Sequence, residues 1–289
     1  MPSRTSATTS SIVTRLSGAI APLDVTGRQI VHSGPVPTPG LDFGGKVVLV
    51  TGGARGVGRG IATSFAGADA RVVVCGRTEP EALPDGVSFV AADVREPEQV
   101  DALVSTIVER HGRLDVLVNN AGGAPPSATA TVSPRFNASI IALNLIAPLT
   151  CAQRANAVMQ TQDDGGSIVN ISSVSGIRPS PNTAAYGAAK AGLLNLTQTL
   201  AVEFAPKVRV NAVTVGLVVT EQARLFYGDD AGIRAVGQTV PLGRMADPSD
   251  VGDVCLFLAS PLARYVSGAN VVVHGGGERP AYLDAANPS

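Results

Sequence analysis

Seven short apolar runs, separated by segments with a helical pattern, constrain the fold of this chain more than any other feature. The runs are rich in valine and lack polar alternation, so they predict parallel strands covered by helices on both faces of a sheet. They occupy residues 46–51, 71–75, 87–91, 115–119, 166–172, 208–213 and 269–273. Helices are expected over residues 57–66, 97–111, 134–159, 183–205 and 248–260. The sequence therefore predicts one α/β domain, a Rossmann-type, doubly wound parallel sheet of seven strands.

Several helix boundaries carry residues suited to ending or starting a helix. Gly112 follows the helix expected to end at His111 and suits a left-handed C-terminal cap. Pro206 is expected to stop the helix that contains Tyr186. Asp247 and Pro248 combine an N-cap with a proline in the first turn, which predicts the start of the last helix.

The first apolar run leads directly into a glycine-rich turn, TGGARGVG, at residues 51–58. Glycines permit a tight turn and a close approach of the backbone to a phosphate, and the following helix start offers unpaired N–H groups. A glycine cluster alone also suits a flexible loop. The preceding strand and the following helix favour a site for the diphosphate of a dinucleotide.

Tyr186 and Lys190 are four residues apart in an expected helix, and Ser173 precedes the tyrosine by thirteen residues. Side chains at this helical spacing share a face, so an ammonium group can lie beside the phenol. A nearby positive charge favours the phenolate and lowers the phenol pKa, which suits a proton donor and acceptor. Because this spacing is also common in purely structural pairs, the interpretation depends on accompanying motifs.

Those motifs are present in order, and the chain resembles the short-chain dehydrogenase/reductase family over residues 43–277, in particular its 3-oxoacyl carrier-protein reductase-like members. The resemblance rests on the glycine-rich turn, Asp93-Val94, the Asn119-Asn120-Ala121-Gly122 run, Asn144, Ser172-Ser173, the Tyr186/Lys190 pair and the segment from Gly216 to Thr220.

The resemblance implies a role for each matching residue. Tyr186 is the expected acid and base, and Ser173 is expected to orient the substrate oxygen. Lys190 would hold the nicotinamide ribose and lower the tyrosine pKa, and Asn144 would anchor a proton-relay water. Only the offset to Tyr186 favours Ser173 over Ser172. The expected cofactor contacts are Thr51, Gly52, Arg55, Gly56, Val57, Gly58, Arg77, Asp93, Val94, Asn120, Ala121, Gly122, Tyr186, Lys190, Gly216, Val218 and Thr220.

The end of the second strand predicts which nicotinamide cofactor is used. A carboxylate there would bind the ribose 2′-OH of NAD and repel a 2′-phosphate, but Gly76 stands at that position. Arg77 follows, and Arg55 lies in the glycine-rich turn, so two cations are available for a phosphate. NADP(H) is therefore the preferred cofactor and NAD(H) a possible one. The alternative is that both arginines are ordinary solvated surface residues.

Four features depart from the family pattern. Val215 replaces the proline usual before Gly216, which should loosen that turn, and His274 replaces the usual acid before two glycines. Only residues 77–88 join the second and third strands, too few for the usual crossover helix. The loop over residues 123–134 is rich in small residues, which widens a pocket.

The substrate is expected to lie among residues 123–135, 174–182 and 217–244. These segments suit an apolar alcohol or ketone, with Arg178 and Arg224 available for an anionic handle such as a thioester carrier. The alternatives are dihydrodiol or other CH–CH redox chemistry on the same fold, and a cofactor-sensing protein without turnover. The intact set of Asn144, Ser173, Tyr186 and Lys190 argues against both.

Composition agrees with a cytoplasmic enzyme. The net charge of −1 gives no reason to expect nucleic acid or a membrane surface as a partner, and no long apolar run predicts a transmembrane span. The three cysteines, Cys75, Cys151 and Cys255, are expected to be reduced core residues, and no spacing of histidines and cysteines predicts a metal site.

Residues 1–42 are expected to form an extension outside the domain, with one short amphipathic helix carrying Ile12, Val13, Leu16 and Ile20. An oligomer-contacting arm and an organelle transit peptide are both compatible with its composition. The tail over residues 278–289 is expected to cover a neighbouring subunit. The resemblance implies a homodimer or homotetramer built on the helices around residues 144–159 and 183–205.

Overall fold

The structure is a computed structural model that describes residues 41–278 and residue 280. Its centre is a seven-stranded sheet with the strand order β3-β2-β1-β4-β5-β6-β7, in which every neighbouring pair is parallel. The strands are β1 (Val47–Thr51), β2 (Arg71–Gly76), β3 (Val87–Ala91), β4 (Val116–Asn119), β5 (Gly166–Ser173), β6 (Val208–Val215) and β7 (Asn270–Val273). The predicted fold class and all seven predicted strands are confirmed.

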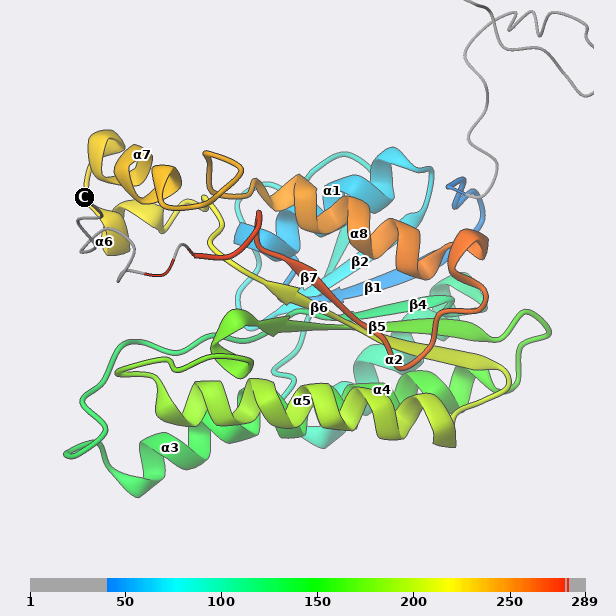
Figure 1. Cartoon of the computed structure of the whole chain (residues 1–289). Coiled ribbons are helices and arrows are strands. Elements are labelled where there is room, and N and C mark those ends of the chain that lie inside the picture. Colours follow the sequence, from blue (N-terminus) through cyan, green and yellow to red (C-terminus); the bar gives the residue numbers. More distant parts are fainter. Residues whose placement is uncertain (1–40, 279, 281–289) are drawn as a thin grey trace, which may run out of the picture. The chain divides into compact units, whose positions relative to one another are not determined.

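Helices cover both faces of this sheet (Figure 1). One layer contains α1 (Gly56–Gly67) and α8 (Pro248–Ala259), and the other contains α2 (Pro97–His111), α4 (Ala147–Met159) and α5 (Ala184–Glu203). The shorter helical elements are α3 (Pro134–Ile141), the π-helical turn η2 (Ala142–Ile146), η3 (Val174–Gly176), α6 (Ala223–Tyr227), α7 (Asp230–Gln238) and η4 (Pro261–Ala263).

The hydrophobic core lies on both sides of the sheet. In β1, Val47 and Leu49 belong to the cluster under α2, α4 and α5, whereas Val48 and Val50 belong to the cluster under α1 and α8. All residues of this strand are buried because successive side chains point to opposite faces and both faces are covered. The three cysteines are buried and unbridged, as expected.

Two predicted helix boundaries, at Gly112 and Asp247, are confirmed, whereas α5 ends at Glu203, before Pro206. Gly112 has a left-handed φ of 76° and its N–H donates to the Val108 carbonyl at 2.7 Å. Asp247 and Asp250 form a reciprocal capping box at the start of α8. Residues 77–86 contain no helix, so the crossover between β2 and β3 is the short one that the sequence predicts.

Two helical features differ from the sequence prediction. The segment expected as one helix over residues 134–159 contains a π turn at residues 142–146, in which the Ala147 N–H donates to the Ala142 carbonyl. Pro148 explains the turn, because it lacks an N–H and its ring would collide with the Asn144 carbonyl in a regular α-helix. The short helices α6 and α7 also lie where the sequence predicts no helix.

The continuous helical segment Pro134–Met159 is long and apolar enough to cross a membrane by length and composition, the one such segment in the part of the chain that the structure describes. In this structure α4 packs against α2, β4 and β5. These contacts make it a covering helix of the sheet. The expectation that the protein has no membrane partner remains a prediction.

A half-buried cation, Arg209, connects β6 to the end of α8. Its guanidinium donates to the carbonyls of Leu258 at 2.7 Å, Ala259 at 3.2 Å and Ser260 at 3.3 Å, and to that of Val266 at 3.2 Å. Burial lowers the pKa of Arg209. Because the last carbonyls of a helix have no partner within the helix, this side chain acts as the C-terminal cap of α8.

We expect Arg209→Met to lower the free energy of unfolding by about 2–4 kcal/mol, because several buried carbonyls lose their donors together. Lys207→Met is the matched control: the Lys207 ammonium also donates to two carbonyls, those of Gln160 and Gln162, but the residue is exposed. Urea denaturation of both variants measures the difference. Equal losses in the two variants would contradict the capping role.

Candidate active site

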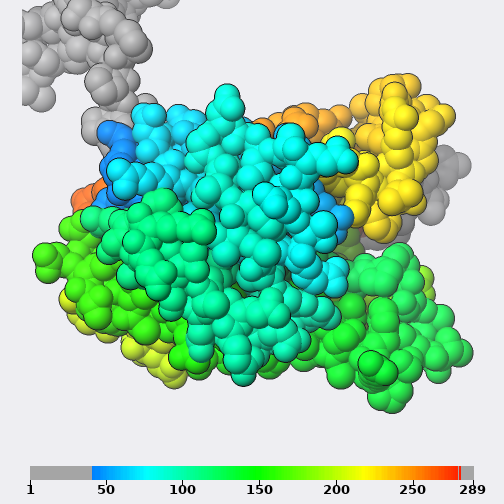
Figure 2. All heavy atoms as spheres, turned by 180° about the vertical axis from the view of Figure 1, so that it is seen from behind, coloured from blue at the N-terminus to red at the C-terminus, as the bar shows by residue number. Residues whose placement is uncertain are grey.

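The parallel sheet brings the ends of four strands to one edge, which we call the carboxyl edge. Thr51 ends β1, Asn119 ends β4, Ser173 ends β5 and Val215 ends β6. The segments around residues 124–140 and 217–240 project at the same end of the molecule, coloured green and yellow in Figure 2. In open α/β sheets, ligands bind at this edge.

Tyr186 and Lys190 lie on one face of α5, as their spacing predicts. The Lys190 ammonium is 5.7 Å from the centre of the Tyr186 ring and donates to the Ile171 carbonyl at 2.8 Å. The lysine is only 2% exposed. Burial lowers its pKa to about 8, because a charged ammonium loses solvation in the protein interior.

The pKa of Tyr186 is raised by burial, and a hydrogen bond with the Ser173 hydroxyl opposes this shift. The expected lowering of the Tyr186 pKa by Lys190 is therefore outweighed by burial. The physical reason is that loss of solvation disfavours the phenolate more than its polar neighbours stabilise it. The phenol consequently remains protonated at neutral pH.

The two serines at the end of β5 have different partners. The Ser172 hydroxyl is buried and donates to the Lys190 carbonyl at 3.1 Å. The Ser173 side chain is half-buried, interacts with Tyr186 and accepts from the Ser175 N–H at 3.2 Å. Because side chains alternate along a strand, only Ser173 points toward the tyrosine.

Asn144 lies in the π turn with a fully buried side chain. Its Oδ1 accepts from the Gly123 N–H at 2.8 Å, and its Nδ2 donates to the carbonyls of Gly123 at 3.0 Å and Ile140 at 2.9 Å. These bonds fix the loop after β4 beside α5. The predicted role of Asn144 in anchoring a proton-relay water remains a prediction.

The glycine-rich turn forms a cradle that only glycine fits. Gly52 and Gly56 have positive φ values of 64° and 54°. A Cβ on Gly58 would lie 2.4 Å from the Asn120 Nδ2 and 2.5 Å from the Gly52 carbonyl oxygen. The Thr51 Oγ1 accepts from the N–H groups of Asn120 and Ala121, both at 3.0 Å. These residues fit the phosphates of a dinucleotide at the start of α1.

The remaining predicted cofactor contacts lie on the loops around this cradle. Arg55, Arg77 and Gly122 are exposed, Val94 is buried, and Val57, Gly216, Val218 and Thr220 are half-buried. The structure places Arg55 at the N-cap position of α1 and Val218 in a bridge with Ala246. Their contacts with a cofactor remain predictions.

Arg95 is a charged neighbour of this site that the sequence reasoning missed. Its Nε donates to the Asp93 Oδ1 at 3.0 Å. This hydrogen bond lowers the pKa of Asp93, and the charge of Arg77 adds a smaller lowering effect. Arg95 is therefore the ion-pair partner of Asp93, and Arg77 acts on the same carboxylate only through its charge. The only signal in the sequence was the close spacing of Asp93 and Arg95.

Glu221 was also missed. Its Oε2 accepts from the Gly56 N–H at 3.0 Å, although the two residues are 165 positions apart. No local pattern connects positions so far apart, so only the folded structure reveals this contact.

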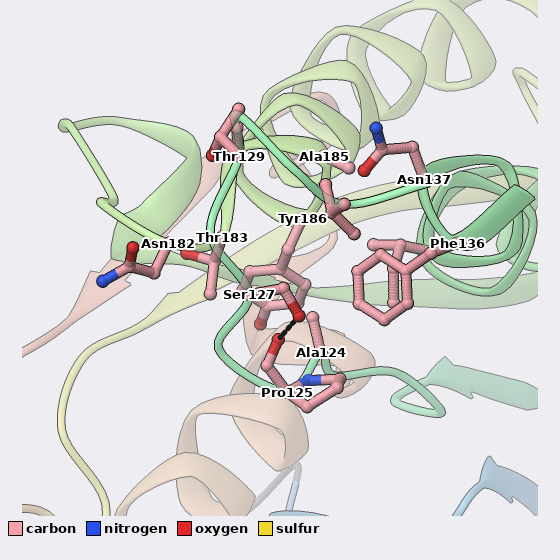
Figure 3. A pocket seen from close by; sticks show the side chains of 13 residues that line it. Ala124, Pro125, Ser127, Thr129, Phe136, Asn137, Asn182, Thr183, Ala185 and Tyr186 are labelled. Atoms are coloured by element: carbon pink, nitrogen blue, oxygen red, sulfur yellow. Dashed lines mark hydrogen bonds between the residues drawn. The ribbon is translucent and has the colours of Figure 1, made fainter. Parts of the chain in front are cut away.

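A pocket borders Tyr186, between the loop after β4, α3 and the start of α5 (Figure 3). Every side chain that lines it is uncharged. Its lining includes the apolar Phe136 and Ile140 and the polar Ser127, Thr129, Asn137 and Asn182. Two of the expected substrate segments therefore contribute to this pocket, and residues 217–244 do not.

Known proteins share this sequence and fold. A family model of the short-chain dehydrogenase type, described as "Enoyl-(Acyl carrier protein) reductase", matches residues 52–278. The chain belongs to the short-chain dehydrogenase/reductase family. An L-fucose dehydrogenase from Oryctolagus cuniculus is 38% identical over 251 residues, which cover 83% of this chain and 87% of the relative. A 3-oxoacyl-[acyl-carrier-protein] reductase from Thermotoga maritima is 35% identical over 242 residues, covering 80% and 97%.

A solved aldohexose dehydrogenase from Thermoplasma acidophilum has a TM-score of 0.76 at 31% identity, covering 86% of this chain and 97% of the other. The protein is thus an oxidoreductase of the short-chain family acting on alcohol and carbonyl groups, and the family uses NAD(P)(H).

The low pKa of Lys190 predicts a specific pH dependence of stability. Below about pH 8 the lysine is charged in both the folded and the unfolded protein, and the folded protein is destabilised by the buried charge. Between that value and its ordinary pKa of 10.5 only the unfolded chain binds the proton, so stability should rise with pH. Relative to Lys190→Met, the wild-type free energy of unfolding should rise by about 2 kcal/mol from about pH 7 to about pH 9.5. If urea denaturation gives a difference between wild type and Lys190→Met that stays constant with pH, the ammonium is not desolvated.

Proposed function

We propose that this protein interconverts a secondary alcohol and a carbonyl on a small neutral molecule, with Tyr186 as the general acid and base and NADP(H) as the preferred cofactor. The observation that carries the proposal is the convergence of Tyr186, Ser173 and Lys190 at the carboxyl edge, beside an uncharged pocket.

The proposed mechanism assigns one task to each side chain. A nicotinamide dinucleotide, when bound, supplies or accepts the hydride. In the reductive direction Ser173 donates a hydrogen bond to the substrate oxygen as negative charge develops there, and Tyr186 donates the proton. The raised pKa of Tyr186 keeps that proton on the phenol at neutral pH. In the oxidative direction the same groups act in reverse.

The pocket supports a neutral, hydroxyl-bearing substrate. Asn137 and Thr129 line it, and their side chains can donate and accept hydrogen bonds. The arginines suggested for an anionic handle have carboxylate partners: Arg178 pairs with Glu278, and Arg224 pairs with Asp230 at 2.8 Å. We propose a sugar or small hydroxyketone as the substrate, the class that the names of the fucose and aldohexose dehydrogenases indicate, and a thioester, as in the reductase relative, as the alternative.

The preference for NADP(H) is supported by the charges after β2 and β3. Gly76 leaves the end of β2 without a carboxylate, and the adjacent Arg77 is exposed. The carboxylate of Asp93, after β3, is paired with Arg95. The guanidinium of Arg77 is therefore available as a charged donor for a 2′-phosphate.

The proposed assembly is a cytoplasmic homodimer or homotetramer built on α4 and α5. Ile146, the last residue of η2 before α4, and Val202, near the end of α5, are exposed apolar side chains. Association would remove them from water. Residues 1–42 are proposed as an extension and residues 278–289 as a tail; apart from residues 41, 42, 278 and 280, both lie outside the described residues.

Tyr186→Phe tests the mechanism. It should reduce turnover by at least ~100-fold, because the general acid is lost, while cofactor affinity stays within about a few-fold. Tyr265→Phe is the matched control, because Tyr265 is fully exposed and has the same hydroxyl to lose. Absorbance of the reduced cofactor measures turnover. Near-normal turnover of Tyr186→Phe on a verified substrate would refute the assignment.

Cofactor preference is tested by Gly76→Asp combined with Arg77→Ala. The double variant introduces repulsion and removes a donor, so the ratio of kcat/KM for NADP(H) to that for NAD(H) should fall by ~100-fold or more. Arg71→Ala, at the opposite end of β2, is the control and should leave the ratio unchanged. A wild-type protein with equal kcat/KM on both cofactors would contradict the proposal.

A further inference from the structure

The carboxylate at the N-terminus of α1 comes from a residue far away in the sequence. No acidic residue lies in the first turn of α1, and the N-cap residue Arg55 makes no capping hydrogen bond with its side chain. The Glu221 Oε2 instead accepts from the Gly56 N–H at 3.0 Å. Unpaired N–H groups at a helix start attract negative charge, which explains why the carboxylate lies there.

The segment that carries Glu221 is seated directly over the glycine cradle. The Thr220 Cγ2 would be 3.6 Å from a Cβ on Gly56, and the Glu221 Oε2 would be 3.9 Å from it. On the N-terminal side of this contact, the Val219 N–H donates to the Ala246 carbonyl at 2.9 Å, which attaches the segment to the domain. Beyond it, α6 exposes Leu225 and Phe226, at 80% and 57% exposure. The Glu221 contact thus joins a weakly packed segment to α1.

The Gly56 N–H belongs to the glycine cradle, which fits the phosphates of a dinucleotide at the start of α1. We propose that Glu221 is an internal competitor for that diphosphate: its carboxylate holds residues 217–227 on the start of α1 and is displaced when a dinucleotide binds. Two anions cannot share one N–H donor without strong repulsion, so the carboxylate must move away.

The inference rests on the proposed cofactor site and adds a prediction that this site alone does not make. The diphosphate is common to NADH and NADPH, so Glu221 should weaken the binding of both cofactors by the same factor. Arg77, in contrast, should act on NADPH alone. Displacement of Glu221 also frees the segment leading into α6, which couples cofactor binding to movement beside the site.

Glu221→Gln is the direct test, because it keeps the side-chain shape and removes the charge. The dissociation constants of NADPH and NADH, measured through the fluorescence of the reduced cofactor, should both fall by roughly three- to tenfold, the scale of an exposed hydrogen bond to a charged group. Glu203→Gln, an exposed residue at the end of α5, removes the same charge elsewhere and should change neither constant.

Amide hydrogen exchange of the ligand-free proteins supplies a second readout. Peptides covering residues 217–227 should exchange faster in Glu221→Gln than in wild type or Glu203→Gln, because the contact with α1 is weakened. Unchanged or weaker binding of both cofactors, or an effect confined to NADPH, would overturn the inference. A wild-type protein that binds neither cofactor would instead refute the proposed function. Independently of that result, equal exchange of residues 217–227 in Glu221→Gln and wild type would refute the role of the Glu221 contact.

Discussion

Parallel hydrogen bonding between β1, β4, β5 and β6 is the constraint on which the site depends. Because these strands run in one direction, their last residues lie at one edge, and the segments that follow them converge there. Thr51 shows how closely the ends are joined, since its hydroxyl accepts from two N–H groups of the loop after β4. The glycine cradle and the Tyr186 face of α5 are therefore positioned by the same sheet.

Burial changes the pKa values of the side chains at this edge more than ion pairing does. Lys190 has no carboxylate partner among the described residues and is held by the Ile171 carbonyl. Its charge is consequently destabilised, and the phenol of Tyr186 is kept in its protonated form. A buried charge without a partner lowers the stability of the fold. Such groups are typical of functional sites.

Much of the fold was predictable because its signals are local. Valine-rich runs mark buried strands, and Gly112 and Asp247 mark helix ends through their own backbone preferences. The site residues on α5 were predictable for the same reason. The π turn at Asn144 required recognising the effect of Pro148 four residues later, and the net direction of the Tyr186 pKa depended on burial. The contacts of Glu221 and Arg209 join residues far apart in sequence and have no local signal.

The central claim is that this carboxyl edge transfers a hydride between a nicotinamide cofactor and a substrate carbon. Incubation with reduced NADP carrying deuterium at the transferable position, together with a panel of hydroxyketones, sugar lactones and acyl thioesters, tests it by mass spectrometry of the products. The account predicts one deuterium on the carbinol carbon for each cofactor oxidised, with a neutral hydroxylated compound as the best acceptor. Tight binding of the cofactor without deuterium transfer to any member of the panel would contradict it.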